Sequence, residues 1–132
     1  MRHVVLASHH CFARGLADTL NFLGNSQPLD VICAYVGECP LESQVAGLFA
    51  EFQDDEVLVL TDILQGSVSQ AFAPFMSDHV FLVAGVNVAV ALELCLHEGP
   101  LTSGLIDRAI ETGRQSMRLI NTYQANVSDD DE

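Results

Sequence analysis

Short apolar runs alternate along the chain with segments that repeat apolar residues at the spacing of one helix face. The runs, rich in β-branched residues, have the length of buried strands. The predicted strands cover residues 2–7, 29–36, 55–62 and 79–85, and the predicted helices cover residues 13–24, 41–53, 67–76, 87–97 and 102–114. This alternation predicts an α/β fold, with an open, mainly parallel sheet and helices on both faces.

The segment after the last predicted helix is ambiguous. Residues 114–127 (RQSMRLINTYQANV) could prolong that helix or form a further strand, and their polarity suggests an edge or an exchanged element. The chain shows neither an internal repeat nor an interdomain linker. We therefore interpret residues 1–126 as a single domain and residues 127–132 as an acidic tail.

Charge and hydropathy limit the classes of function. The formal net charge is −13, and the five basic residues, all arginines, are scattered, so a nucleic-acid partner is not expected. The acidic surface either steers basic protein partners toward the chain or simply keeps it solvated. The apolar runs are far shorter than the ~20 residues that span a bilayer, so no membrane helix is predicted. The chain begins without the pattern of a secretory signal, and we expect a cytoplasmic location.

Polar and small residues gather in the loops that follow three of the predicted strands. These loops contain Ser8-His9-His10-Cys11, Asp62 through Ser67, and Gly85-Val86-Asn87. Ligand sites in such sheets lie beyond the carboxyl ends of the strands, where the strand order reverses. With strand order 2-1-3-4, the first two of these loops meet.

Three chemistries could use this edge of the sheet. Adjacent residues that leave a strand point in different directions, so His9, His10 and Cys11 rarely share one metal ion, and no metal site is expected. A cysteine nucleophile beside its own histidine base rarely has the required geometry. The third chemistry is a nucleophilic histidine, which can accept a phosphoryl group on one ring nitrogen when a carboxylate holds the other.

Asp62 is placed to hold such a histidine, and Gly66 and Ser67 could donate hydrogen bonds to the phosphoryl oxygens as a Gly-Ser turn that opens a helix. The residues alone leave a plainer interpretation open. In it the two histidines are polar loop residues, Asp62 ends a strand, and Ser67 is the N-cap of a helix. Asn87 is most simply a helix cap.

Four motifs in order resemble the mannose-type IIA domains of the bacterial phosphoenolpyruvate-dependent sugar phosphotransferase system (PTS). They are VVLASHHCFARGL, VLVLTDILQGSVSQAF, LVAGVNVAVALEL and AIETGRQSM, and they extend from the first strand to about Met117. The resemblance implies a phosphocarrier that needs neither a metal nor another cofactor. It also implies a homodimer that exchanges an antiparallel C-terminal edge strand, and contact with the membrane only through the permease complex.

The resemblance also implies roles for single residues. His9 would accept the phosphoryl group from the histidine phosphocarrier HPr and pass it to a IIB component for sugar uptake, while Asp62 would hold its imidazole. Gly66 and Ser67 would bind the phosphoryl oxygens, and Asn87 would lie near the site in a structural role.

Three positions depart from the family's pattern. His10 and Gln65 stand where the family has glycine, and Val68 stands where it has proline. A side chain in place of glycine restricts the backbone beside His9 and in the phosphate turn. Two other functions therefore stay open: a phosphorylatable regulatory subunit, of the sensor or dihydroxyacetone kinase type, and a binding module that has lost phosphotransfer.

Overall fold

The computed structural model describes residues 1–123, and within them four parallel strands form one sheet in the order β2-β1-β3-β4. The strands are β1 (Arg2–His9), β2 (Leu29–Ala34), β3 (Glu56–Thr61) and β4 (Val80–Val83). The helices are α1 (Phe12–Phe22), α2 (Leu41–Phe52), α3 (Ser67–Phe72), α4 (Val88–Leu96) and α5 (Ser103–Arg114), with a 3₁₀-helix η1 (Ala73–Phe75). The predicted fold class and strand order are confirmed.

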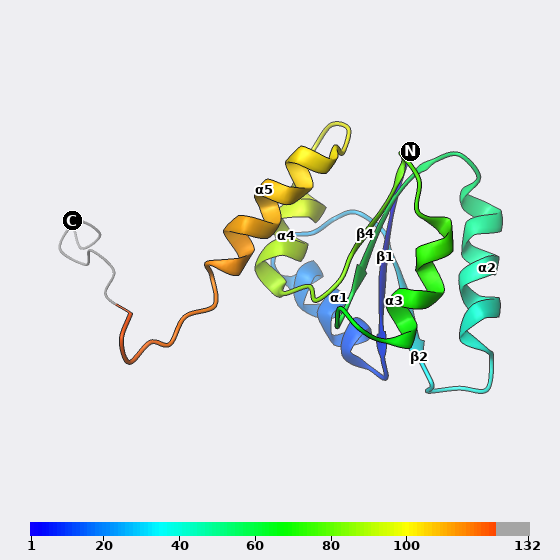
Figure 1. Cartoon of the computed structure of the whole chain (residues 1–132), viewed down its shortest axis with the longest axis horizontal. Helices are drawn as coiled ribbons and strands as arrows, with labels where there is room; N and C mark the ends of the chain where they lie inside the picture. The colour runs from blue at the N-terminus through cyan, green and yellow to red at the C-terminus, as the bar shows by residue number, and fades with distance from the viewer. Residues whose placement is uncertain (124–132) are drawn as a thin grey trace.

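Helices cover both faces of the sheet. Figure 1 shows α2 and α3 on one face and α1, α4 and α5 on the other. Alternate residues of β1 serve the two cores: Val4 and Leu6 pack with α1, α4 and α5, whereas Val5 and Ala7 pack with α2 and α3. Burial on both faces explains why the strands are continuous apolar runs rather than alternating ones.

The strand register brings three loops to one edge of the sheet. His9, the last residue of β1, pairs with Ala34 at the end of β2, and Ala7 pairs with Thr61 at the end of β3. His9 therefore leaves the sheet beside Asp62 and beside the first residues after β2.

The structure corrects two details of the third predicted helix. Its α-helical part ends at Phe72, because Pro74 lacks an amide proton and its ring crowds the preceding turn, and the chain continues as η1. Ser67 is not the N-cap of this helix. Gly66 occupies that position, and Ser67 is the first helical residue, with its hydroxyl hydrogen-bonded elsewhere.

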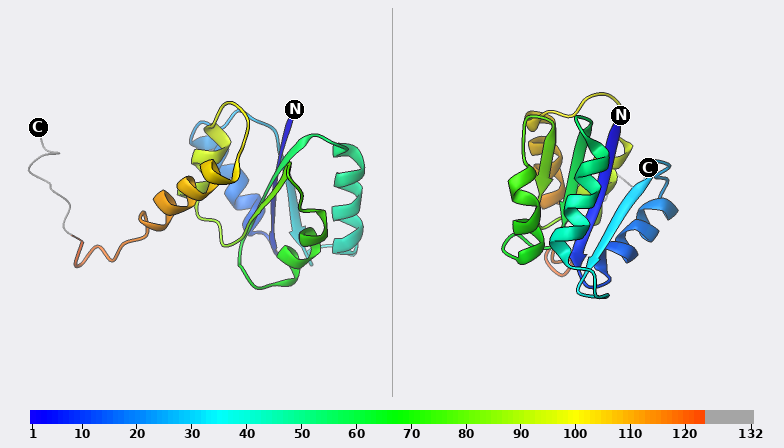
Figure 2. Two further views of the ribbon diagram at one scale, coloured as in Figure 1. Left: turned by 45° about the horizontal axis from the view of Figure 1, so that its top comes forward. Right: turned by 90° about the vertical axis from the view of Figure 1, so that its right-hand side faces the viewer.

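Residues 115–123 form turns and irregular backbone after α5, and neither prolong that helix nor form a strand in the single chain. Figure 2 shows this segment leading away from the sheet and its helices. An exchanged strand needs a second copy and stays a prediction, and residues 124–132, which include the predicted acidic tail, lie outside the described residues. Across residues 1–123, every helix is too short or too polar to cross a membrane.

Candidate active site

The turn from β1 into α1 is held by a buried serine. The Ser8 hydroxyl accepts a hydrogen bond from the Ala13 amide at 2.7 Å and donates one to the His10 carbonyl at 2.9 Å. The His10 amide donates to the Ala34 carbonyl at 2.9 Å, and His10 takes a left-handed backbone with φ of 56°. Glycine adopts that conformation freely, whereas for another residue it costs about 1 kcal/mol of conformational free energy. His10 therefore takes the backbone of a glycine position, and the turn presents His9 at the edge of the sheet.

His9 and Asp62 form the centre of the site. The His9 amide donates to Asp62 Oδ2 at 2.9 Å, and His9 Nδ1 lies 3.0 Å from the same oxygen and 3.4 Å from Oδ1. A carboxylate can only accept, so Nδ1 carries a proton, and in the neutral form of the ring Nε2 has the free lone pair. The side chain of His9 is 36% exposed and that of Asp62 is 15% exposed. The pair thus presents an imidazole to solvent with its Nδ1 held by Asp62.

The pKa of Asp62 is set by opposing effects. Burial by itself raises the pKa of this carboxyl, but hydrogen bonds from the His9 amide and the His9 ring outweigh it and hold the pKa below its usual value. Asp62 is therefore ionised at neutral pH. Its negative charge therefore lies within hydrogen-bond distance of the His9 ring.

Gly66 permits the turn before α3 to approach His9. A Cβ atom built at Gly66 would lie 2.9 Å from His9 Cε1 and 3.2 Å from Ile63 Cδ1, and the first of these distances is shorter than real Cβ contacts. Because Gly66 has no side chain, the turn can lie directly against the imidazole of His9. Its own φ of −175° is ordinary extended backbone.

Buried hydroxyls fix the loop between β3 and α3. Thr61 Oγ1 and Ser69 Oγ lie 2.7 Å apart, and Ser69 Oγ donates to the Ile63 carbonyl at 3.0 Å. Both side chains are buried. The loop that contains Asp62 and Gly66 is therefore tied to the sheet at one end and to α3 at the other.

Tyr35 belongs to the site and was missed by the sequence analysis. It follows Ala34, the residue paired with His9, and its ring centroid lies 6.0 Å from that of His9. Its hydroxyl lies 2.5 Å from Ser67 Oγ. The signal that could have found it is the strand order itself, because β2 adjoins β1 and its loop must end beside His9.

Asn87 has the structural role predicted for it as a helix cap. Its Oδ1 accepts from the Val90 amide at 2.9 Å, at the start of α4, and its Nδ2 donates to the Gly113 carbonyl at 2.9 Å. The side chain therefore joins α4 to α5 rather than contacting His9.

Residues 1–123 contain no group of three or more histidine, cysteine or acidic side chains that could hold a metal ion. Cys95 is buried in the core, where burial raises the pKa of its thiol to about 11, and Cys33 packs against the same core.

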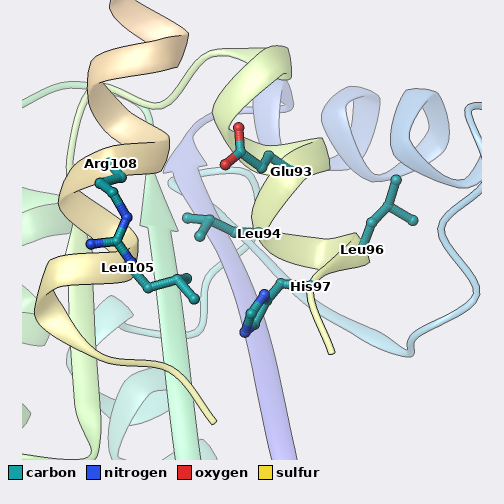
Figure 3. Close-up of a pocket in the computed structure, with 6 residues that line it drawn as sticks. All are labelled: Glu93, Leu94, Leu96, His97, Leu105 and Arg108. Carbon is teal, nitrogen blue, oxygen red and sulfur yellow. The ribbon is translucent and has the colours of Figure 1, made fainter. Parts of the chain in front are cut away.

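A hollow of about 420 Å³ lies between α4 and α5 (Figure 3). It is lined by Glu93, Leu94, Leu96, His97, Leu105 and Arg108. Arg2, the first residue of β1, donates to the His97 carbonyl, so this hollow lies toward the opposite edge of the sheet from His9. It shares no residue with the site around His9.

A family profile described as "PTS system fructose IIA component" matches residues 3–109, most of the chain. The chain belongs to this family.

Solved structures extend the similarity to the fold. A protein of Klebsiella pneumoniae, assigned as a phosphoenolpyruvate-dependent sugar PTS permease, is 35% identical with a TM-score of 0.82, over 92% of each chain. The PTS IIA protein associated with the fucose utilization operon of Streptococcus pneumoniae is 25% identical with a TM-score of 0.76, over 91% of this IIA chain and 93% of its own. The mannose/sorbose-specific IIA subunit of Enterococcus faecalis, 18% identical over 95% of this chain and 98% of its own, shares the fold with a TM-score of 0.77. No curated protein sequence matches the chain.

Proposed function

We propose that this IIA chain is a phosphocarrier of a sugar phosphotransferase system, and that His9 Nε2 is the atom that carries the phosphoryl group. Membership of the IIA family supports a role in the PTS. The observation that carries the proposal further is the His9–Asp62 pair, in which Nδ1 and the backbone amide of His9 both bond one carboxylate oxygen. The nitrogen that remains faces solvent with its lone pair free.

The transfer needs few groups. The lone pair of His9 Nε2 attacks phosphorus as the bond to the donor's nitrogen breaks, and the imidazole becomes positively charged. The Asp62 carboxylate stabilises that charge through the Nδ1 proton. The Ser67 hydroxyl and the backbone amides of the turn at Gly66 donate to the phosphoryl oxygens. Phosphoryl transfer depends mainly on such positioning and charge stabilisation, so neither a metal nor another cofactor is required.

The proposed partners are phospho-HPr as donor and a IIB component as acceptor, which places the chain in the cytoplasm and near the membrane only through its permease. The net charge of −13 favours docking to a basic surface. We therefore expect the association rate with HPr to fall as ionic strength rises. An association rate that is insensitive to salt would contradict this docking mode.

The chain is proposed to work as a homodimer in which residues after α5 are exchanged as an antiparallel edge strand. Met117 and Ile120 support this, because their side chains are 77% and 75% exposed in the single chain. Such side chains favour burial against another surface. The outer edge of β4, which pairs only with β3 within the described chain, is a place where a strand could add.

Phosphorylation of variants tests the assignment to His9. The chain is incubated with enzyme I, HPr and phosphoenolpyruvate, and the product is analysed by intact mass and site mapping. We expect one acid-labile phosphoryl group on the wild type, on His10→Ala and on the control His79→Ala, a histidine at the other end of the sheet. We expect none on His9→Ala.

Other outcomes have distinct meanings. A phosphoryl group that persists in His9→Ala and disappears in His10→Ala would move the nucleophile by one residue. A wild-type chain that stays unmodified would favour a binding module. A chain that is phosphorylated but passes nothing to IIB would favour a regulatory subunit.

A further inference from the structure

One contact joins two loops across the site. The Tyr35 hydroxyl, from the loop after β2, lies 2.5 Å from Ser67 Oγ at the start of α3. Tyr35 is 58% exposed, and its ring is tilted by 39° relative to the His9 ring. A side chain this exposed is not held by core packing, so its hydroxyl contact with Ser67 is the main interaction that gives it a defined position.

The backbone of Tyr35 also has an unusual conformation. Its φ is 68°, in the left-handed region that bulky residues avoid at a cost of about 1 kcal/mol. His10, on the neighbouring turn, is left-handed as well, and its amide bonds the carbonyl of Ala34, the residue before Tyr35. The two turns therefore fix each other, and together they direct the tyrosine toward α3. Strained backbone that its surroundings maintain is common at functional sites.

We propose that Tyr35 is a positioning residue for the Ser67 hydroxyl, an inference that rests on the phosphocarrier function proposed above. A phenol is a better proton donor than an alcohol, so Tyr35 donates to Ser67 Oγ. The proton of Ser67 is then free to point toward a phosphoryl oxygen on His9. Donation from Tyr35 also polarises the serine hydroxyl and makes it a stronger donor, because chained hydrogen bonds reinforce one another.

The role requires no chemistry of Tyr35 itself. During transfer the phosphoryl group leaves the donor's histidine nitrogen and bonds to His9 Nε2, and neither Tyr35 nor Ser67 gains or loses a proton. The hydrogen bond from Ser67 strengthens as the phosphoryl oxygens gain charge in the transition state. A change in the direction of that bond alters the rate rather than the fold.

A double-mutant cycle tests the positioning role. Tyr35→Phe keeps the ring and removes the hydroxyl, and we expect it to slow transfer from phospho-HPr about tenfold, the value of one hydrogen bond to a charged group. In a Ser67→Ala background the same change should have no further effect, because its target is gone. Tyr123→Phe, the other tyrosine of the chain, is the matched control and should leave the rate unchanged. A wild-type rate for Tyr35→Phe, or an equal loss in both backgrounds, would overturn the proposal.

A fluorescence measurement tests the coupling between Tyr35 and Ser67 without HPr. The chain contains no tryptophan and two tyrosines, so Tyr35 is the only source of tyrosine emission in Tyr123→Phe. Phosphoramidate, a small phosphoryl donor, is used to load His9 without HPr. We expect loading to change the emission of Tyr35, and expect Ser67→Ala to abolish that change. An emission change that survives Ser67→Ala, or none in the parent, would refute the coupling even where HPr transfer succeeds. Loading from phosphoramidate without transfer from HPr would instead refute only the proposed donor.

Discussion

At the scale of single residues, the departure from the family's pattern at His10 has different consequences from a change at Gly66. His10 adopts the left-handed backbone of a glycine position with its amide and carbonyl both hydrogen-bonded. Gly66, in contrast, has ordinary backbone and almost touches the His9 ring. The glycine that the site depends on is thus the one that limits bulk beside the imidazole.

Gly66→Ala is expected to impair transfer while the fold persists. The new methyl group would lie 2.9 Å from His9 Cε1, so the ring must move away from Asp62 or the turn must open. We expect the rate of phosphotransfer to fall about tenfold or more, because misplacement of a reacting group by a fraction of an ångström is costly.

Gly47→Ala is the matched control, since Gly47 lies within α2 and a Cβ there would meet nothing within 4 Å. It should leave the rate unchanged and raise the free energy of unfolding by about 0.5 to 1 kcal/mol. Stopped-flow transfer and urea unfolding measure the two effects. A full rate for Gly66→Ala would show that the turn opens without cost.

At the scale of elements, the periodic pattern was sufficient to predict the strands, the helices and the α/β class, whereas the strand order does not follow from it. Buried parallel strands and amphipathic helices each leave a strong signal, and the carboxyl-end rule then placed His9 and Asp62 at one edge. Tyr35 was missed although the strand order puts the loop after β2 beside His9, because the direction of its side chain depends on a left-handed turn that no local pattern predicts. The contact between the Ser67 hydroxyl and Tyr35 was not predictable either, since the two residues lie 32 positions apart in the sequence.

The close contact between α4 and α5 predicts that a side chain at Gly113 lowers stability. A Cβ at Gly113 would lie 2.0 Å from Val90 Cγ2 and 3.3 Å from Asn87 Oδ1, so the helices touch here through a glycine. We expect Gly113→Ala to lower the free energy of unfolding by about 1 to 3 kcal/mol through overpacking. Gly104→Ala, on the same helix, should not destabilise, because its nearest neighbour is 3.7 Å away at the end of Arg108.

Denaturant unfolding measures the effect of Gly113→Ala on stability. A second substitution that removes the clash tests its cause. Val90→Ala removes the methyl groups that the new Cβ would strike. The double variant should therefore be more stable than the sum of the two single changes predicts. Strict additivity would mean that α4 and α5 separate instead of clashing.

At the scale of the whole molecule, stability is expected to decline in acid. Burial raises the pKa of Glu56, but hydrogen bonds from Arg2 and from the Leu101 amide outweigh it, so its folded pKa is lowered, as is that of Asp62. A lowered folded pKa contributes stability above the unfolded value, about 4, which is lost as pH falls through the folded pKa. We expect Glu56→Gln to cost about 1 to 2 kcal/mol at pH 7 and to flatten this acid loss. Glu51→Gln, an exposed change on α2, should do neither when urea unfolding is followed from pH 7 to pH 3.

The proposed exchange of a C-terminal strand predicts the oligomeric state of the whole molecule. The segment after α5 exposes four large apolar side chains in the single chain: Met117, Leu119, Ile120 and Tyr123. The outer edge of β4 meanwhile pairs with nothing in the described residues. Exchange between two copies would bury these side chains and complete the sheet, which removes an exposed strand edge.

Deletion of residues 117–132 should therefore convert a dimer into a monomer, whereas deletion of residues 127–132 should leave the dimer intact. Light scattering during gel filtration distinguishes the two species, and a full chain that elutes as a monomer, or a dimer that survives the longer deletion, would rule out the exchange.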